Sequence, residues 1–329
     1  MPKPNVFITI DTEHSIGGAF ENPTLKPVGN DKRIYGRIDG KAYGIGLIMD
    51  IADRYGIPLT FFVEVLNKYY FGEGETREVC EYILGRGHDV QLHLHPNYLN
   101  FKENDPAQRR YLDNMSAYDL ENQVALIGEG NELLTRYCGR PAVAFRAGNY
   151  GADRNTLKAV KANGLIFDSS YNAAFPRHSG RISEELLNDG RELEGVWELP
   201  VTNFIEKVPL RGERSKPLDL NGVSFGEMKA VVEQACCGKG PLNLTFILHS
   251  FSFVKALDVQ YSRCKVRNYV VKRFENLCRL LHDKNNELTC WNLSKFSAGG
   301  GLVSSPSYWP EVAPHLSVLR AFEQKICEL

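Results

Sequence analysis

The sequence lacks long apolar runs, an excess of charge of either sign, and paired cysteines. No apolar run approaches the roughly 18 residues of a membrane-spanning helix, so we expect no membrane span. Lys and Arg number 39 against 40 for Asp and Glu, which leaves no basic field for nucleic acid or an anionic membrane. The eight cysteines form no CxxC pair, so we expect reduced thiols.

The first residues also lack the pattern of a signal peptide. Met1–Asn5 lead straight into a short apolar run and then into acidic residues. A signal peptide would need a longer apolar stretch and a cleavage site of small residues. We therefore expect a cytoplasmic protein.

Short β-rich runs alternate with amphipathic stretches along the chain, which predicts alternating strands and helices. The predicted strands span 5–11, 58–63, 89–93, 142–146, 165–168, 196–199, 243–249 and 288–291. The predicted helices span 44–55, 77–84, about 116–137 with a capping box at Ser116, 153–163, 225–236, 263–282 and 315–327.

About seven or eight β–α alternations without a clear boundary predict one α/β domain, a distorted parallel β/α barrel. We assign residues 1–297 to this barrel and 298–329 to a C-terminal extension with one helix. Residues 177–217 are rich in Pro, Gly and charge, and we interpret them as an insertion across one face. The glycines at 299–301 mark the expected break before the extension.

Polar residues follow five of the predicted strands at their C-terminal ends, where a β/α barrel places its functional groups. They are Asp11 and Glu13, His93 and His95, Arg146, Asp168, and His249. Because strand side chains alternate, Asp11 should share a face with Glu13, and His93 with His95. Two carboxylates and several imidazoles on one rim favour a metal-dependent hydrolase. The remaining histidines, which we interpret as structural or surface groups, are His14, His88, His178, His282 and His315.

The runs at these strand ends resemble, in order, motifs of the NodB-type polysaccharide deacetylases, carbohydrate esterase family 4. The run at 9–13 is similar to Thr-Phe-Asp-Asp, whose first Asp is the base and whose second binds metal. Asp11 takes the first position and Thr12 the second, so the metal carboxylate falls on Glu13. Residues 87–93 resemble the run that enters His-x-x-x-His, which places the first His on His93 and the second position on Asn97.

Three further runs complete the resemblance, which covers roughly residues 5–295. Residues 145–151 are similar to Arg-Pro-Pro-Tyr-Gly, residues 164–170 to the Asp-Ser-Ser element, and residues 247–249 to the last motif. The resemblance implies the NodB-type fold, an Arg146 that pairs with the base, a His249 that is the general acid, and an Asp168 that orients it.

The resemblance implies that the protein removes an acetyl group from an N-acetylated sugar with the help of a divalent metal, most simply Zn²⁺. Zinc would need three protein ligands and an open position. We expect Glu13, His93 and either His95, which the strand alternation favours, or Asn97, which the family spacing favours. A backbone N–H near Asn149 or Tyr150 would support the oxyanion.

Two alternatives stay open at this point. One is a metal-dependent amidohydrolase that acts on a non-sugar amide, which a narrow, closed pocket would favour. The other is a barrel that has lost its metal and only binds carbohydrate. If the protein is cytoplasmic, a precursor of a surface polysaccharide is the expected substrate. The strand end at Trp197 could add an aromatic wall for a sugar.

Overall fold

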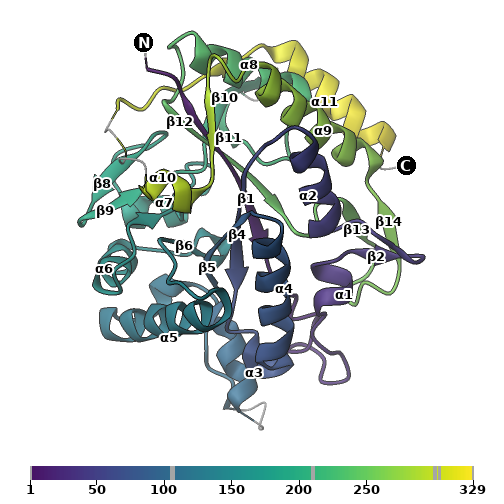
Figure 1. The fold of residues 1–329 in the computed structure, drawn as a ribbon, viewed down its shortest axis with the longest axis vertical. Helices are drawn as coiled ribbons and strands as arrows, with labels where there is room; N and C mark the ends of the chain where they lie inside the picture. Colours follow the sequence, from purple (N-terminus) through teal and green to yellow (C-terminus); the bar gives the residue numbers. More distant parts are fainter. Residues whose placement is uncertain (1, 104–107, 209–211, 299–301, 303–304, 328–329) are drawn as a thin grey trace.

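The computed structural model describes residues 2–103, 108–208, 212–298, 302 and 305–327 (Figure 1). Its main sheet has the strand order β12-β1-β4-β5-β6-β7-β9-β8, with β15 beside β1. The strands of this sheet are β1 (Asn5–Thr12), β4 (Leu59–Glu64), β5 (Asp89–Leu94), β6 (Ala144–Ala147), β7 (Phe167–Asp168), β8 (Arg191–Leu193), β9 (Val196–Glu198), β12 (Asn243–His249) and β15 (Thr289–Trp291). Neighbouring strands run parallel, except that β8 is antiparallel to β9.

Helices follow most of these strands and cover the outside of the sheet (Figure 1). The α-helices are α1 (Asn30–Arg33), α2 (Ile45–Arg54), α3 (Lys68–Phe71), α4 (Glu73–Gly85), α5 (Leu120–Cys138), α6 (Arg154–Ala162), α7 (Pro176–Ile182), α8 (Phe225–Cys236), α9 (Asn268–Asp283), α10 (Leu293–Ala298) and α11 (Pro314–Cys327). The short 3₁₀ helices are η1 (Pro96–Lys102), η3 (Met115–Ala117) and η4 (Gly148–Tyr150). Helix α5 packs between α4 and α6, and α8 contacts both α9 and α11.

The sheet is curled, and a segment without regular structure spans the gap between β9 and β12. Leu199 N donates to Asp168 O at 2.7 Å, and Thr202 N donates to Thr245 O of β12 at 3.1 Å. Thr245 N in turn donates to the Thr202 hydroxyl at 2.9 Å. These bonds link the two sides of the sheet in place of a complete strand. The predicted distorted β/α barrel is therefore confirmed.

Strand β1 lies inside the sheet and is buried along nearly its whole length. Of its eight residues only Asn5 is partly exposed. Its apolar side chains, such as Phe7 and Ile10, are fully buried, as expected for a parallel strand covered on both faces. Because the strands are parallel, their C-terminal ends meet at one rim, and β1 delivers its last residues to the middle of that rim.

Three small sheets lie outside the main one. They are formed by β10 (Asn203–Val208), β11 (Gly212–Pro217) and β16 (Glu311–Val312), by β13 (Val254–Ala256) with β14 (Cys264–Val266), and by β2 (Arg37–Ile38) with β3 (Lys41–Ala42). Residues 177–217 are thus more than an insertion. Strands β8 and β9 belong to the main sheet, and only the β10–β11 hairpin stands apart from it. The strand predicted at 196–199 is confirmed as β9, whereas the interpretation of 177–217 as an insertion is wrong for β8, which pairs with it.

Most predicted elements match the observed ones within a few residues, but two helix starts are wrong. Asp119, not Ser116, is the N-cap of α5, and its side chain accepts a hydrogen bond from Asn122 N at 2.9 Å. Ser116 lies in η3 instead. Helix α9 begins at Asn268 rather than 263, because residues 264–266 pair with β13.

The C-terminal helix α11 is anchored on the barrel by a buried arginine. Arg320 forms ion pairs with Glu206 of β10 and with Glu227 of α8, and both carboxylates are fully buried. The glycines at 299–301 fall outside the described residues.

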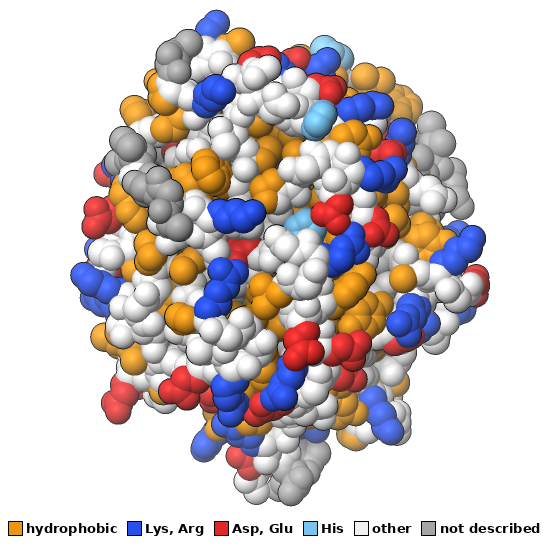
Figure 2. Space-filling model, in the orientation of Figure 1, with side chains coloured by type: hydrophobic (Ala, Val, Ile, Leu, Met, Phe, Trp, Pro, Cys, Tyr) orange, Lys and Arg blue, Asp and Glu red, His pale blue; other side chains and the backbone are white. Residues whose placement is uncertain are grey.

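Charges of both signs are interspersed over the face seen in Figure 2, in keeping with the balanced composition. Among the described helices, none combines the length and the apolar character that crossing a membrane requires.

Candidate active site

A cavity of about 360 Å³ lies at the C-terminal rim of the barrel. It falls near the lower end of the roughly 300–1,000 Å³ typical of ligand pockets. The residues that line it are Asp11, Glu13, His93, His95, Asn149, Tyr150, Asn172, Phe175, His178, Pro217, Asp219 and His249. The loops after β1, β5, β6, β7 and β12 thus contribute to one space, as the strand-end pattern predicts.

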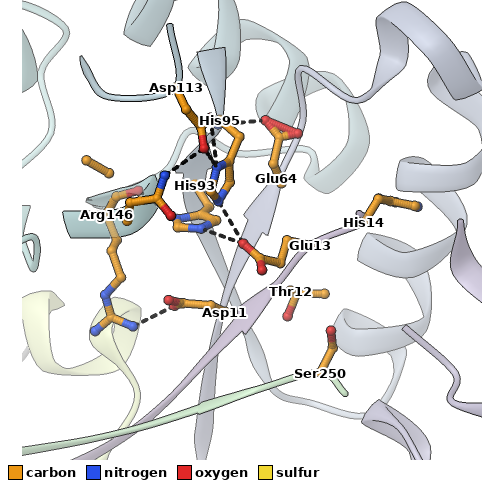
Figure 3. Close-up of polar contacts among 12 residues, drawn as sticks. Asp11, Thr12, Glu13, His14, Glu64, His93, His95, Asp113, Arg146 and Ser250 are labelled. Atoms are coloured by element: carbon orange, nitrogen blue, oxygen red, sulfur yellow. Dashed lines mark hydrogen bonds and ion pairs between the residues drawn. The ribbon is translucent and has the colours of Figure 1, made fainter. Parts of the chain in front are cut away.

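Glu13 and two histidines form a compact cluster in this cavity (Figure 3). One ligand atom from each of Glu13, His93 and His95 lies within 4.8 Å of the others. Glu13 Oε2 is 2.7 Å from His95 Nε2 and 3.4 Å from His93 Nε2. The predicted pairing of the two histidines on one face is confirmed by this arrangement.

The outer nitrogen of each imidazole is held by a second group. His93 Nδ1 lies 2.7 Å from the carbonyl oxygen of Arg146, and His95 Nδ1 lies 3.0 Å from the carboxylate of Asp113. Both Nε2 atoms therefore point toward Glu13. Metal-binding histidines in proteins are held in this way, with the outer N–H bonded to a carbonyl or carboxylate. The donor set suits a small divalent cation such as Zn²⁺.

The electrostatics of the cluster reflect close charges in a buried space. Burial raises the pKa of Glu13, but His95, His93 and Arg33 outweigh it and hold that pKa well below its usual range. Burial lowers the pKa of His95, yet Asp113 and Glu13 together raise it well above its usual value. Arg33 Nη2 donates to Glu13 Oε1 at 2.9 Å, which leaves Oε2 facing the histidines.

Asp11 lies beside the cluster and is held by Arg146. Arg146 Nη1 donates to Asp11 Oδ1 at 2.7 Å (Figure 3). The arginine is fully buried and donates its Nε to Ser169 O at 3.0 Å. Burial raises the pKa of Asp11, but Arg146, His93 and His249 outweigh it, so that the pKa is lowered. Asp11 is therefore ionised at neutral pH.

His249 lines the same cavity, but Asp168 does not hold it. The His249 ring packs against Phe251 with ring centroids 5.0 Å apart. Both Asp168 oxygens accept hydrogen bonds from Ser170, at 2.9 Å each. No hydrogen bond joins Asp168 to His249 in the part of the chain that the structure describes. The prediction that Asp168 orients His249 is not met, because Asp168 lies behind the rim, fully buried, beside Glu198 on the neighbouring strand.

Asn97 does not line the cavity that holds the cluster. It lines a separate pocket, between the loop that follows β1 and the loop between β13 and β14. Trp197 also lies away from the cavity, packed against a core cluster that includes Phe167 and Leu199. The aromatic residues of the cavity are Tyr150 and Phe175 instead, so the prediction for Trp197 is wrong. His178, interpreted as structural, lines the cavity.

Several cavity residues come from loops that carry no periodic signal. Asp113 lies between η1 and η3, and Asp219 follows β11, next to β12. Phe175 and His178 lie at the start of helix α7. This helix was not predicted, because its sequence is charged and contains proline. Only the position of a loop on the rim identifies such residues, and that position depends on the complete fold.

The backbone after β6 is strained where it borders the cavity. Asn149 and Tyr150 have φ values of 54° and 56°, in the left-handed region that non-glycine residues rarely adopt. Such strain persists where the surroundings fix it and is frequent at functional sites. Gly148, just before them, packs directly against the His95 ring.

A Gly-x-Ser-x-Gly run at residues 222–226 has a structural role. Ser224 is the N-cap of α8, and its hydroxyl accepts a hydrogen bond from Glu227 N at 3.3 Å and donates to Glu227 Oε2 at 2.9 Å. This serine is a helix cap and is not assigned as a nucleophile.

Comparison with known proteins identifies the fold. No family model and no curated protein matches the chain. Among solved structures, 4-α-glucanotransferase from Thermococcus litoralis matches with a TM-score of 0.52 and 11% identity, over 100% of this chain and 47% of that one. The chain thus spans about half of that protein. What the two share is the fold.

Proteins of the kind that the sequence motifs resemble are also among the matches. A protein from Mycobacterium smegmatis that is assigned as a polysaccharide deacetylase matches with a TM-score of 0.48 and 15% identity, over 93% of this chain and 95% of its own. A family 4 carbohydrate esterase from Streptomyces lividans matches with a TM-score of 0.44 and 10% identity, over 92% of this chain and 98% of its own.

Proposed function

We propose that this protein is a metal-dependent hydrolase that removes the acetyl group from an acetamido sugar, as the NodB-type deacetylases do. The observation that carries the proposal is the cluster of Glu13, His93 and His95 beside an Asp11 that Arg146 holds ionised. The ligands we assign are these three residues, with His95 preferred to Asn97. An imidazole is also a better zinc ligand than an amide oxygen.

A bound Zn²⁺ would polarise the acetamide carbonyl and lower the pKa of a nearby water. Asp11, as general base, takes a proton from the attacking water while the water oxygen bonds to the carbonyl carbon. Arg146 keeps Asp11 ionised and oriented for this step. A backbone N–H near Asn149 or Tyr150 supports the negative charge that develops on the carbonyl oxygen.

His249 acts as the general acid in this proposal. When the C–N bond breaks, it gives its proton to the departing amine, and acetate and the free amino sugar are the products. Loss of such an acid or base typically lowers the rate by about 10²–10⁴-fold. We therefore expect Asp11→Asn and His249→Ala to lose turnover while they keep their fold and bind metal.

The decisive test is the metal content of the purified protein after loading with Zn²⁺. We expect one metal per chain in the wild type and in Asn97→Ala, and its loss in Glu13→Ala, His93→Ala and His95→Ala. Metal retained in His95→Ala and lost in Asn97→Ala would reverse the ligand assignment. If the wild type binds no metal under any loading condition, the proposed hydrolase is refuted, and the alternative of a barrel that only binds carbohydrate remains.

The setting of the proposed reaction is the synthesis of a surface polysaccharide in the cytoplasm. This part of the proposal rests on the sequence pattern alone. Fractionation of cells that produce the full-length chain would test the location.

A further inference from the structure

One wall of the cavity carries a buried amide with an unused donor. Asn172 is 1% exposed. Its Oδ1 accepts hydrogen bonds from Ala174 N at 3.1 Å and from Asn203 Nδ2 at 3.2 Å. These bonds fix the orientation of the amide. Its Nδ2 carries two N–H groups, faces the Tyr150 hydroxyl and has no other hydrogen-bond partner in the described part of the chain. Buried donors are nearly always paired, so the second N–H at this cavity wall points to a ligand.

The Tyr150 phenol shows where this amide faces. Burial raises the pKa of Tyr150, and among the smaller influences Asp11 and Asp219 raise it while Asn172 lowers it. Asn172 therefore lies next to the Tyr150 hydroxyl, within the electrostatic reach of the Asp11 carboxylate. A group bound to Asn172 would lie close to the reacting centre.

A second unpaired nitrogen lies on the same wall. His178 lines the cavity, and its Nδ1 is buried without a hydrogen-bond partner among the described residues. Burial and Arg181 lower the pKa of His178, so the imidazole is neutral at neutral pH. A neutral imidazole nitrogen can donate or accept, as a sugar hydroxyl can.

Two aromatic rings line the same cavity as these groups. The rings of Tyr150 and Phe175 are 5.3 Å apart and tilted by 34°, and Phe175 is 44% exposed. An exposed aromatic ring in a cavity that also presents polar groups suits a ligand that has an apolar face and a polar edge. A pyranose ring has both.

The charge and size of the cavity further restrict the ligands that it can hold. Neither Lys nor Arg is among the described residues that line it, whereas Asp11, Glu13 and Asp219 are. Asp11 and Glu13 are paired with Arg146 and Arg33, and none of the described lining side chains is a lysine or arginine that could pair with a phosphate or carboxylate on the bound ring. At about 360 Å³, the cavity has room for one sugar ring.

We propose that Asn172, Phe175 and His178 form a specificity subsite that holds a single, uncharged acetamido sugar ring, either free or at the end of a chain. The inference rests on the proposed deacetylase function and adds the size and charge of its substrate. Asn172 and His178 bind ring hydroxyls, and Phe175 packs on the apolar face. These residues determine which sugar presents its acetamide to Asp11 and His249.

The test measures binding and turnover separately. The probes are N-acetylglucosamine, N-acetylgalactosamine, N-acetylmannosamine and the hexamer of N-acetylglucosamine. Phe175→Ala and His178→Ala are compared with Phe322→Ala and His315→Ala, which make the same changes at exposed positions of α11. Asn172→Asp keeps the accepting oxygen and removes the donor.

We expect the KM of the preferred sugar to rise roughly three- to tenfold in each subsite variant, with kcat nearly unchanged and both control variants like the wild type. Mass spectrometry of the hexamer should show deacetylation at terminal units only. Equal deacetylation of internal units, or an unchanged KM in Phe175→Ala and His178→Ala, would overturn the subsite.

Binding separates this inference from the proposed reaction. Calorimetry with the three monosaccharides is run on Asp11→Asn, with and without Zn²⁺. If wild-type protein releases no acetate from any probe, but a monosaccharide binds and Phe175→Ala weakens it, the subsite stands and the reaction does not. If acetate is released and the subsite variants bind normally, the reaction stands and the subsite is wrong. Binding of none of the three sugars would also refute the subsite.

Discussion

The contact between Gly148 and His95 makes a single added methyl group a sensitive test of the proposed metal centre. A Cβ at position 148 would lie 2.5, 2.6 and 2.7 Å from three atoms of the His95 ring. Ordinary contact begins near 3.4 Å, so the ring or the backbone must move by roughly 0.7–0.9 Å. Metal–ligand distances tolerate only about 0.2 Å. The required displacement is about four times larger.

Gly148→Ala should therefore weaken Zn²⁺ binding about 10–100-fold, the range seen when groups that orient a ligand are changed. Overpacking should also cost about 1–3 kcal/mol of stability. Competition with a chromogenic chelator measures the affinity, and urea unfolding of the metal-free protein measures the stability. Gly85→Ala is the control, since a Cβ there meets nothing within 4 Å. Wild-type zinc affinity in Gly148→Ala would refute the role of His95 or the tight packing of its ring.

Three further predictions concern one side chain beside the proposed metal cluster, one buried behind the rim and one that anchors helix α11. Asp113→Asn should lower zinc affinity about 10–100-fold, because it weakens the group that orients His95; unchanged affinity in the chelator assay would contradict this. Burial, with Asp168 close by, raises the pKa of Glu198 well above its usual value, so the folded state holds a proton that the unfolded state loses near pH 4–5. Stability should fall as pH rises from about 5 toward the folded pKa. Glu198→Gln, whose amide can donate to Asp168 at any pH, should raise the Tm more at pH 8 than at pH 5. An equal rise in Tm at both pH values would argue against a proton bound at Glu198 in the folded state. Arg320→Leu leaves the buried Glu227 without its ion-pair partner and leaves the buried Glu206 with Arg214 alone. It should cost about 3–5 kcal/mol in urea unfolding; the exposed Arg279→Leu should cost little, and equal losses would contradict the anchoring role.

The fold could be predicted because the pattern that specifies it is local. Parallel strands that are buried on both faces, such as β12, have continuous apolar runs in their sequence. Helices that cover the sheet, such as α8, show an amphipathic period. The bounds of both α8 and β12 agree with the prediction. The side-chain alternation that places Asp11 with Glu13 is equally local. Two residues of separation on a strand fix a shared face whatever surrounds them.

The parts that could not be predicted depend on contacts between distant loops. Asp168 ends a strand as predicted, but its oxygens are taken by Ser170 two residues away. His178 and Asn172 reach the cavity because β9 and the 199–202 segment close the barrel. The sequence of residues 169–182 has no periodic pattern from which this closure of the barrel could be predicted. The end of a predicted strand shows that a residue lies at the rim of the barrel, but it does not predict which side chains at the rim contact one another.

Strand β1 also has a consequence for how the chain acquires its shape. It pairs with β4 nearby in sequence, but its other neighbours, β12 and β15, lie more than 230 residues further along. Until those strands have been synthesised, one edge of an apolar strand stays open to pairing with other chains. Contacts between such distant residues also form slowly. Asp11 can meet its register partner His249 only at the end of this process. The fragments made earlier therefore contain an exposed, aggregation-prone edge, and they lack the proposed pair of general base and general acid.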